Sequence, residues 1–248
     1  MTKSSISTVD TTGQSYRTLS PEETEDIVSR ILYEDNHVLV LNKRPGEIVQ
    51  GDKTGDEPLV EKLKAFIALR DGKPGQVFLG VPHRLDRPVS GAVILAKTSK
   101  ALTRLSAAFR EGNAGKIYWA LVENAPVPPE GEIHTWLTRN EKQNKSYSHP
   151  LPKPGAKEAL LRYRLLRPTK NYFLVEVELL TGRHHQIRCQ LASIGCPIKG
   201  DLKYGARRSN PDGSISLHAR QVTFLHPTRK EPVTVTAPTP MEEMYLQL

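Results

Sequence analysis

Short apolar segments of strand length recur along most of this 248-residue chain, and they limit the fold more than any other feature. Turns separate them, and they do not alternate regularly with helices as the strands of a doubly wound parallel sheet do. The predicted strands lie at 37–41, 77–81, 92–96, 116–122, 133–137, 159–166, 172–180, 215–225 and 232–237. This pattern predicts an α+β domain with a mixed, mainly antiparallel sheet.

Helical patterns stand between some of these strands. Ser20 and Pro21 are typical of a helix start. Ile27, Ile31 and Leu32 then recur at helical spacing, so we expect them on one face of this first helix. Further helices are expected at 57–70, 99–111 and 184–195, and the polar segment 199–214 is expected to be a loop.

The chain length suits one large domain, which we place at residues 21–248. Residues 1–20 are rich in Ser and Thr, so a flexible tail is expected there. The start lacks the apolar stretch of a signal peptide, and no apolar run reaches the ~20 residues that a membrane span needs. A cytoplasmic protein with no membrane partner is therefore predicted. A monomer is also expected.

The chain is basic, with a formal net charge of +8. An excess of Lys and Arg favours polyanionic partners, because these side chains neutralise phosphates. Many basic proteins bind no nucleic acid, so the charge must be interpreted together with the motifs.

The segment HRLDRPVSG holds the first candidate site. In it Asp86 lies among the cationic or polar side chains of His83, Arg84 and Arg87, which would stabilise a carboxylate anion. A carboxylate fixed in a rigid loop can act as a nucleophile, a general base or a metal ligand. A structural ion pair is the alternative reading, because such pairs also occur far from any site.

Several classes of chemistry lack their motifs in this chain. Cations surround Asp86 and no carboxylate or histidine pair near it in sequence completes a coordination shell, so no metal site is predicted. Phosphate-binding, dinucleotide-binding, zinc-protease and serine-esterase motifs are also missing. The sequence therefore predicts carboxylate chemistry without a cofactor.

Two further segments carry candidate residues. The segment TGRHHQIRCQLASIGCPIKGDLKYG gathers basic residues around an expected helix start and its following loop: Arg183, His184, His185, Arg188, Lys199 and Lys203. Such a helix start suits a phosphate, and a solvated basic face is the alternative reading. In KIYWALV, period 2 puts the first and third side chains on one face of a strand. A tyrosine in such a strand is more often a core residue.

Together, HRLDRPVSG, KIYWALV and TGRHHQIRCQLASIGCPIKGDLKYG resemble, in this order and spacing, the RluA family of RNA pseudouridine synthases. The resemblance runs from about 37 to about 238, since LNKRPGEIVQ and SLHARQVTFLHP also look like family motifs. It implies the pseudouridine synthase fold, a long mixed but mainly antiparallel sheet flanked by helices, with a central RNA-binding cleft and no metal or organic cofactor.

The resemblance also implies roles for individual residues. Asp86 corresponds to the catalytic aspartate, Tyr118 to the active-site tyrosine and Arg188 to the arginine that pairs with the aspartate. Arg84 matches the arginine that helps to displace the target base. The remaining implied substrate-binding residues are His83, Arg87, Lys116, Arg183, His185 and Leu217.

The reaction explains these residue types. Uracil must leave the ribose at N1, turn and rejoin it through C5. Asp86 could attack the ribose C1′, attack uracil C6 or deprotonate C2′, and the sequence leaves these routes open. Tyr118 could stack on the uracil and remove, or help to remove, the C5 proton. A stacked uridine must first be flipped out, and Arg84 could fill the gap.

Several points stay open at the level of sequence. Ribosomal and transfer RNA are both possible substrates, and RNA selection is expected to fall to the catalytic domain. Val89 stands where many relatives have Thr, so a hydroxyl contact is lost there. A non-catalytic RNA-binding protein and an RNA-cleaving or base-removing hydrolase are the alternative functions, and the joint presence of Asp86, Tyr118 and Arg188 disfavours the first.

Overall fold

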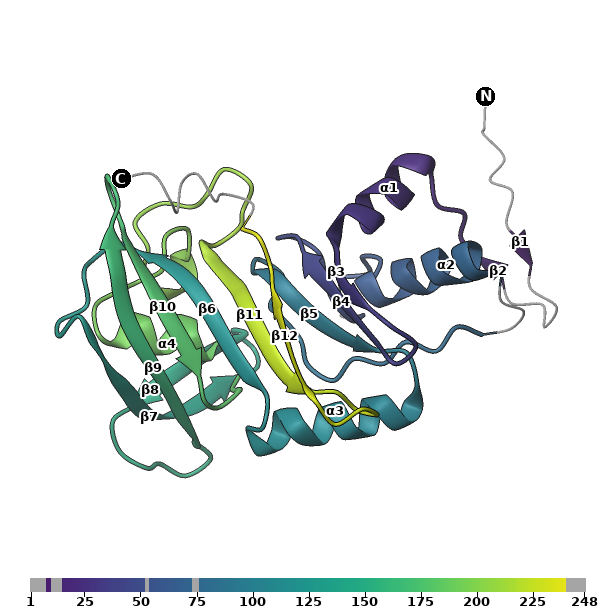
Figure 1. The fold of residues 1–248 in the computed structure, drawn as a ribbon. Coiled ribbons are helices and arrows are strands. Elements are labelled where there is room, and N and C mark those ends of the chain that lie inside the picture. Colours follow the sequence, from purple (N-terminus) through teal and green to yellow (C-terminus); the bar gives the residue numbers. More distant parts are fainter. Residues whose placement is uncertain (1–7, 10–14, 52–53, 73–75, 240–248) are drawn as a thin grey trace.

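One long sheet crosses the molecule from end to end (Figure 1). The computed structural model describes residues 8–9, 15–51, 54–72 and 76–239. The sheet has the order β3-β4-β5-β11-β6-β10-β9-β7-β8, with β12 paired to β11. Its strands are β3 (Ile31–Glu34), β4 (Val38–Lys43), β5 (Ser90–Ala96), β6 (Gly115–Val122), β7 (Glu130–Asn140), β8 (Lys145–His149), β9 (Lys157–Pro168), β10 (Phe173–Leu179), β11 (Leu217–Leu225) and β12 (Pro232–Thr236).

The pairing of these strands is antiparallel except between β5 and β11, which are parallel. Two short strands, β1 (Thr8–Val9) and β2 (Ser15–Tyr16), form a separate pair. The helices are α1 (Pro21–Arg30), α2 (Leu59–Asp71), α3 (Ser99–Glu111) and α4 (Gln186–Ser193), with a 3-10 turn η1 (Leu202–Tyr204). The expected α+β fold with a mixed, mainly antiparallel sheet is confirmed.

Side-chain alternation divides the core between the two faces of the sheet. On β4, Leu39 and Leu41 belong to the larger cluster, together with residues of α2 and α4. Val38 and Val40 point to the other face, into the cluster that contains residues of α3 and β12. The helices α2 and α4 therefore cover different parts of one face.

The first helix ends earlier than its apolar spacing predicts. Ser20 and Glu23 form a capping box at its start, as the sequence indicates. Ile31, however, is already extended and pairs with Leu41, and Ile31 and Leu32 belong to β3. The expectation that they lie on the helix is wrong, because β-branched and aromatic residues here complete a sheet edge.

The prediction of a strand at 77–81 is also wrong, since in this segment only Gly80 makes a bridge, with Ala96. The edge of β5 that faces away from β4 is already occupied elsewhere. Ser90 and Gly91 pair with β11, and the N–H of Ile94 donates to the His83 ring at 3.0 Å. The chain before the Asp86 loop therefore crosses this edge and cannot add a full strand.

The segment after β10 differs from its expected form as well. The helix expected at 184–195 begins only at Gln186, because His185 adopts a left-handed conformation with φ 53°. It ends at Ser193. The expected loop 199–214 contains η1, and β8 was not predicted. These differences place His184 and His185 ahead of the helix, on a tight turn.

The expected tail at 1–20 falls partly on residues 1–7 and 10–14, which lie outside the described residues. Leu19 is buried against the domain, and the Tyr16 hydroxyl accepts the N–H of Val77 at 2.7 Å. In the described part of the chain, no helix is both long and apolar enough to cross a membrane.

Candidate active site

The loop that carries Asp86 is held to the sheet by its apolar residues. Leu85 and Val89 are buried in the larger core cluster, whereas Arg84 and Asp86 reach solvent. Gly91 then brings β5 against β11, with φ +114° and no room for a side chain, since a Cβ would lie 2.4 Å from the carbonyl oxygen of Ala219. This close approach fixes the end of the loop.

The buried side chain of Lys43 binds the backbone of the same loop. Its side chain is fully buried, and its ammonium donates to the carbonyl oxygens of Arg44, Arg87 and Val89 at 2.9, 3.1 and 2.7 Å. Burial lowers the pKa of Lys43 to about 8. One side chain thus fixes the backbone on both sides of Pro88, close to Asp86.

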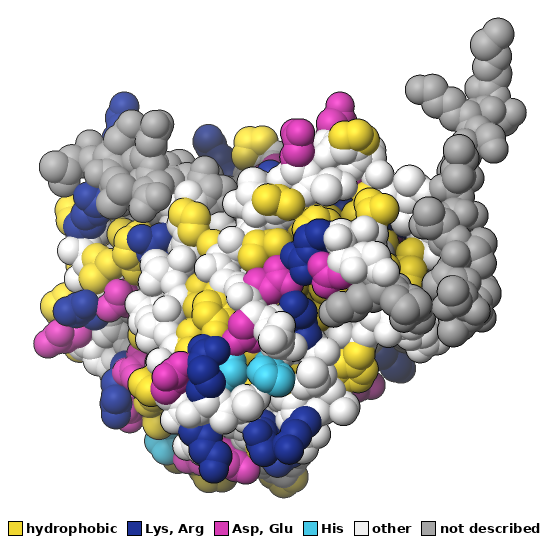
Figure 2. Space-filling model, turned by 45° about the vertical axis from the view of Figure 1, so that its right-hand side comes forward, with side chains coloured by type: hydrophobic (Ala, Val, Ile, Leu, Met, Phe, Trp, Pro, Cys, Tyr) yellow, Lys and Arg dark blue, Asp and Glu magenta, His cyan; other side chains and the backbone are white. Residues whose placement is uncertain are grey.

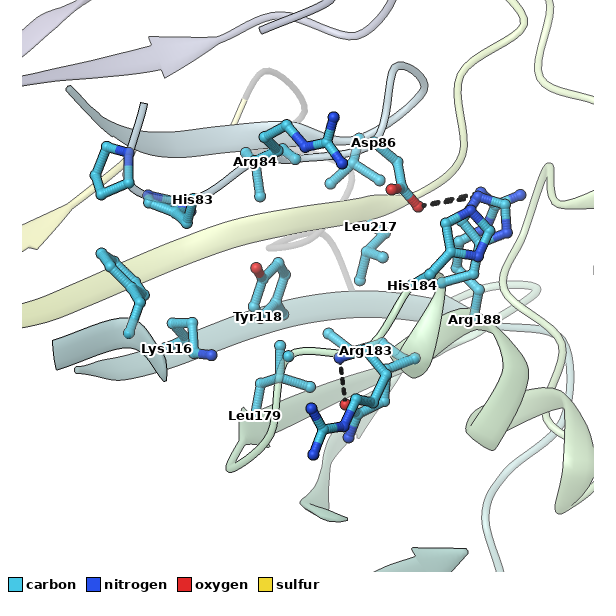
Figure 3. Close-up of a pocket in the computed structure, with 18 of the residues that line it drawn as sticks. His83, Arg84, Asp86, Lys116, Tyr118, Leu179, Arg183, His184, Arg188 and Leu217 are labelled. Carbon is cyan, nitrogen blue, oxygen red and sulfur yellow. Dashed lines mark hydrogen bonds and ion pairs between the residues drawn. The ribbon is translucent and has the colours of Figure 1, made fainter. Parts of the chain in front are cut away.

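A cavity of about 420 Å³ opens beside this loop (Figure 3). The Asp86 loop, the end of α3, β6, the turn before α4 and the start of α4 line it. Asp86 is the one carboxylate among the described residues that line it. Its cationic lining residues are Arg84, Arg110, Lys116, Arg139, Arg183 and Arg188. Such an excess of positive charge attracts an anionic ligand.

Arg188 connects Asp86 to the interior. It comes from the first turn of α4, is buried, and its Nη1 donates to Asp86 Oδ2 at 3.2 Å. Its other nitrogens bind Asp201, with Nε to Oδ2 at 2.6 Å and Nη2 to Oδ1 at 2.9 Å. Asp201 is 1% exposed, so this pair is shielded from water. The guanidinium therefore has little freedom to turn.

His185 provides a second contact to Asp86, with its Nε2 3.5 Å from Oδ2. The Tyr204 hydroxyl accepts the N–H of Ser146 at 2.8 Å and lies 2.9 Å from His185 Nδ1. Because a carboxylate only accepts, the proton of the neutral ring belongs on Nε2, and Tyr204 donates to Nδ1. Burial and the nearby Arg188 lower the pKa of His185 to about 2, so the ring stays neutral.

Tyr118 lies on β6 with its hydroxyl in the cavity, below the Asp86 loop (Figure 3). It is 7% exposed. Burial, and then the nearby Asp86, raise the pKa of its hydroxyl above the ordinary value. Its ring is therefore a neutral, mostly apolar surface at the floor of the cavity, suited to stacking against a flat ligand.

Most of the other residues implied by the motifs meet in this cavity. Lys116 lies on β6 with Tyr118, Leu217 begins the neighbouring β11, and Arg183 lies on the turn before α4. His83 stacks on Phe109, and burial lowers the pKa of His83 to about 3. Arg84 and His185 also line the cavity.

Arg87 is not among the lining residues. Its guanidinium pairs with Asp56 and contacts Thr54 instead. It lies next to Asp86 in sequence, but the chain turns at Arg87 and Pro88, where the N–H of Val89 donates to the carbonyl oxygen of Asp86. The structure therefore does not bring Arg87 to the cavity.

Three residues that matter for this geometry were not identified from sequence: Lys43, Asp201 and Tyr204. All three fall within segments that carry the resemblance, LNKRPGEIVQ and the KGDLKYG end of the last motif. A polar residue in such a segment can position a second residue that contacts the ligand, even where it does not contact the ligand itself. That consideration would have singled out Asp201 and Tyr204.

Comparison with known proteins identifies the family of this chain. The family model described as RNA pseudouridylate synthase matches residues 37–193. An uncharacterised RNA pseudouridine synthase of Synechocystis is 33% identical over 220 residues, which are 87% of this chain and 67% of that protein. Ribosomal large subunit pseudouridine synthase C of Vibrio vulnificus is 35% identical over 214 residues, 84% of this chain and 65% of that protein.

Ribosomal large subunit pseudouridine synthase D of Zymomonas mobilis is 32% identical over 234 residues, covering 90% of this chain and 73% of that protein. The chain thus spans about two thirds to three quarters of the length of these relatives. The structure titled Human RNA Pseudouridylate Synthase Domain Containing 4 has the same fold, with a TM-score of 0.75 at 24% identity over 88% of this chain and 92% of that one. The chain therefore belongs to the RluA family of RNA pseudouridine synthases.

Proposed function

We propose that this chain isomerises specific uridines in RNA to pseudouridine and that Asp86 reacts with the flipped nucleotide. The observation that supports this most directly is the position of Asp86, a half-exposed carboxylate at the mouth of a strongly cationic cavity. Arg188 and His185 hold its Oδ2 from the buried side. The other carboxylate oxygen has no hydrogen-bond donor among the described residues and can face a ligand.

The cavity fits a nucleotide that has left its stack. A flipped uridine brings a flat base and an anionic backbone, which suit the Tyr118 ring and the surrounding cations. Figure 2 shows Lys and Arg side chains gathered around histidines on one face of the molecule. Arg84 is exposed beside Asp86, so its side chain is free to enter the space that the base leaves.

Each route open to Asp86 uses the same environment. Attack on C1′ or C6 needs an anionic oxygen, and removal of the C2′ proton needs the same oxygen as a base. The Arg188 guanidinium compensates this charge without giving up its own proton to the carboxylate. Because the pKa of Tyr118 is raised, its hydroxyl is protonated when the uracil arrives, and it positions or relays the C5 proton.

Ribosomal RNA is the favoured substrate, because relatives from Vibrio vulnificus and Zymomonas mobilis are named as ribosomal large subunit pseudouridine synthases. Transfer RNA is the second candidate. We expect the protein to act in the cytoplasm, as a monomer and without a metal or organic cofactor. Mapping pseudouridines in total RNA from cells with and without the protein tests the activity and the substrate, and an unchanged map would contradict both.

Replacement of the carboxylate tests the chemistry. Asp86→Asn and Asp86→Ala should abolish isomerisation while leaving the fold and the RNA affinity largely intact. Asp56→Asn is the matched control, since Asp56 pairs with Arg87 beside the same loop but outside the cavity lining. Full activity of either Asp86 variant would exclude the proposed role. Release of free uracil or scission of the RNA by the wild-type protein would favour a hydrolase instead.

A further inference from the structure

A second cavity, of about 220 Å³, opens beside the first. The two linings share Arg139, Gly182, Arg183 and His184, so the turn at 182–184 is the partition between them. The second cavity has no carboxylate among its described lining residues. It is thus a cationic extension of the site that holds Asp86.

Strand register builds this second cavity. On the shared face of β7, β8 and β9, Lys157 lies opposite Leu137, and Ser146 lies opposite Arg139. Cys189 of α4 packs with Leu137 and Ala159, so the helix covers the inner part of this face. The helix begins at Gln186, and the cavity lies beyond its start, next to His184.

The cations of this cavity have no counter-ions in the part of the chain that the structure describes. Among the described residues, no carboxylate lies within ion-pair distance of Arg139 or Lys157. Arg183 Nε donates to the carbonyl oxygen of Glu158 at 2.8 Å, which points its guanidinium without neutralising it. Arg17 and Arg70, by contrast, each bind two carboxylates.

The partition between the cavities is rigid. The His184 ring stacks on that of His185 with 3.8 Å between centroids. Its Nδ1 lies 2.9 Å from Ser146 Oγ and its Nε2 lies 3.0 Å from Asn144 Oδ1. Burial, and then the charge of Arg139, lower the pKa of His184. An RNA strand that leaves the first cavity on this side therefore crosses the neutral, fixed ring of His184.

We propose that the second cavity binds the backbone phosphate of a nucleotide next to the flipped uridine, through Arg139, Lys157 and Arg183. This inference rests on the proposed function, because a flipped nucleotide stays joined to its neighbours through phosphates. Arg183 lines both cavities and so lies where the strand passes from one to the other. The cavity carries three cations and no carboxylate among its described lining residues, as a phosphate requires.

Binding at several salt concentrations tests this without turnover. The probe is a short fluorescein-labelled oligouridylate, and the variants are Arg139→Ala and Lys157→Ala. Each should weaken binding by about tenfold, the loss expected of one charge-assisted hydrogen bond. Each should also flatten the slope of log affinity against log salt by about 0.7, the value for one lost phosphate contact on a single strand.

Two matched variants control for net charge. Lys170→Ala removes an exposed lysine in the turn after β9, at the opposite end of the strand from Lys157. This variant should keep the wild-type slope. Arg139→Lys keeps the charge and should restore most of the slope. Wild-type slopes in both alanine variants would overturn the proposal, and so would an equal change in Lys170→Ala. Failure of the wild-type protein to make pseudouridine would count against the proposed function and leave these binding results to decide the subsite.

Discussion

Arg188 binds Asp201 through two parallel hydrogen bonds and has one nitrogen left, which reaches Asp86 at 3.2 Å. The fork of the guanidinium is rigid, so the position of Asp201 decides where that third nitrogen points. Asp201 thus acts on Asp86 through Arg188. We class it as a positioning residue, because it does not line the cavity.

Asp201→Asn should lower kcat by roughly 10- to 100-fold with little change in KM, because the amide cannot accept both guanidinium bonds and Arg188 can turn away from Asp86. The variant should also lose about 3 kcal/mol of stability, since Arg188 keeps a buried charge with one partner fewer. Steady-state kinetics and urea denaturation measure the two effects.

Asp35→Asn is the control for stability alone. Like Asp201, Asp35 bonds an arginine, Arg229; it also bonds His226, and it lies outside the cavity lining. It should destabilise the fold without a specific loss in kcat. A KM effect in Asp201→Asn as large as its kcat effect would contradict the positioning role.

Tyr204→Phe tests the tautomer of His185. The variant keeps the ring, which packs 5.1 Å from the Arg188 guanidinium carbon, and removes only the hydroxyl that donates to His185 Nδ1. Part of the population should then carry the proton on Nδ1 and present a lone pair to Asp86, so kcat should fall by about tenfold.

Nitrogen NMR of the labelled ring reads the tautomer directly and should show an Nε2–H ring in the wild type. Tyr147→Phe removes an exposed hydroxyl that bonds Gln143, and it should change neither signal nor rate. An Nδ1–H ring in the wild-type protein would refute the assignment.

The sequence predicts the periodic parts of this molecule well and the paired parts poorly. Strands such as β9 and β10 alternate along their own residues, so their faces can be read directly. The Arg188–Asp201 pair depends on how the segment 194–200 brings the chain back past β6, where Ile198 bridges Val122, and no local period records this. Likewise Arg84 and Arg87 both lie within two residues of Asp86 in sequence, but the contact with Asp56 takes Arg87 out of the cavity.

Tyr118→Phe separates stacking from proton transfer. The ring that faces the cavity is unchanged, so RNA affinity should stay within about twofold, whereas loss of the hydroxyl should slow product formation by roughly 10²- to 10⁴-fold. Because burial raises the pKa of Tyr118, the wild-type rate should show no rise caused by its ionisation from neutral pH to the ordinary tyrosine range.

A pH–rate profile and a binding titration make these measurements. Tyr163→Phe is the matched control, since Tyr163 is equally buried but bonds the carbonyl oxygen of Pro128 away from the cavity. Unchanged turnover in Tyr118→Phe would leave the tyrosine with a stacking role only.

Buried histidines should make the protein sensitive to mild acid. Burial, the largest cause for each, lowers the pKa from 6.5 to about 3 for His83, about 2 for His185 and about 4 for His218. Below pH 6.5 the unfolded chain takes up protons at these residues and the folded chain does not. Stability is therefore full above pH 6.5 and falls as the pH drops toward the folded-state values, approaching about 1.4 kcal/mol per pH unit for each histidine.

Urea denaturation followed by circular dichroism between neutral pH and the onset of carboxylate titration should show this slope. His218→Gln should reduce it by about a third, because that residue is fully buried between Ser90 and the carbonyl oxygen of Ala237 and lies outside the cavity lining. A free energy of unfolding that does not change over this range would mean that the folded protein takes up these protons as readily as the unfolded chain.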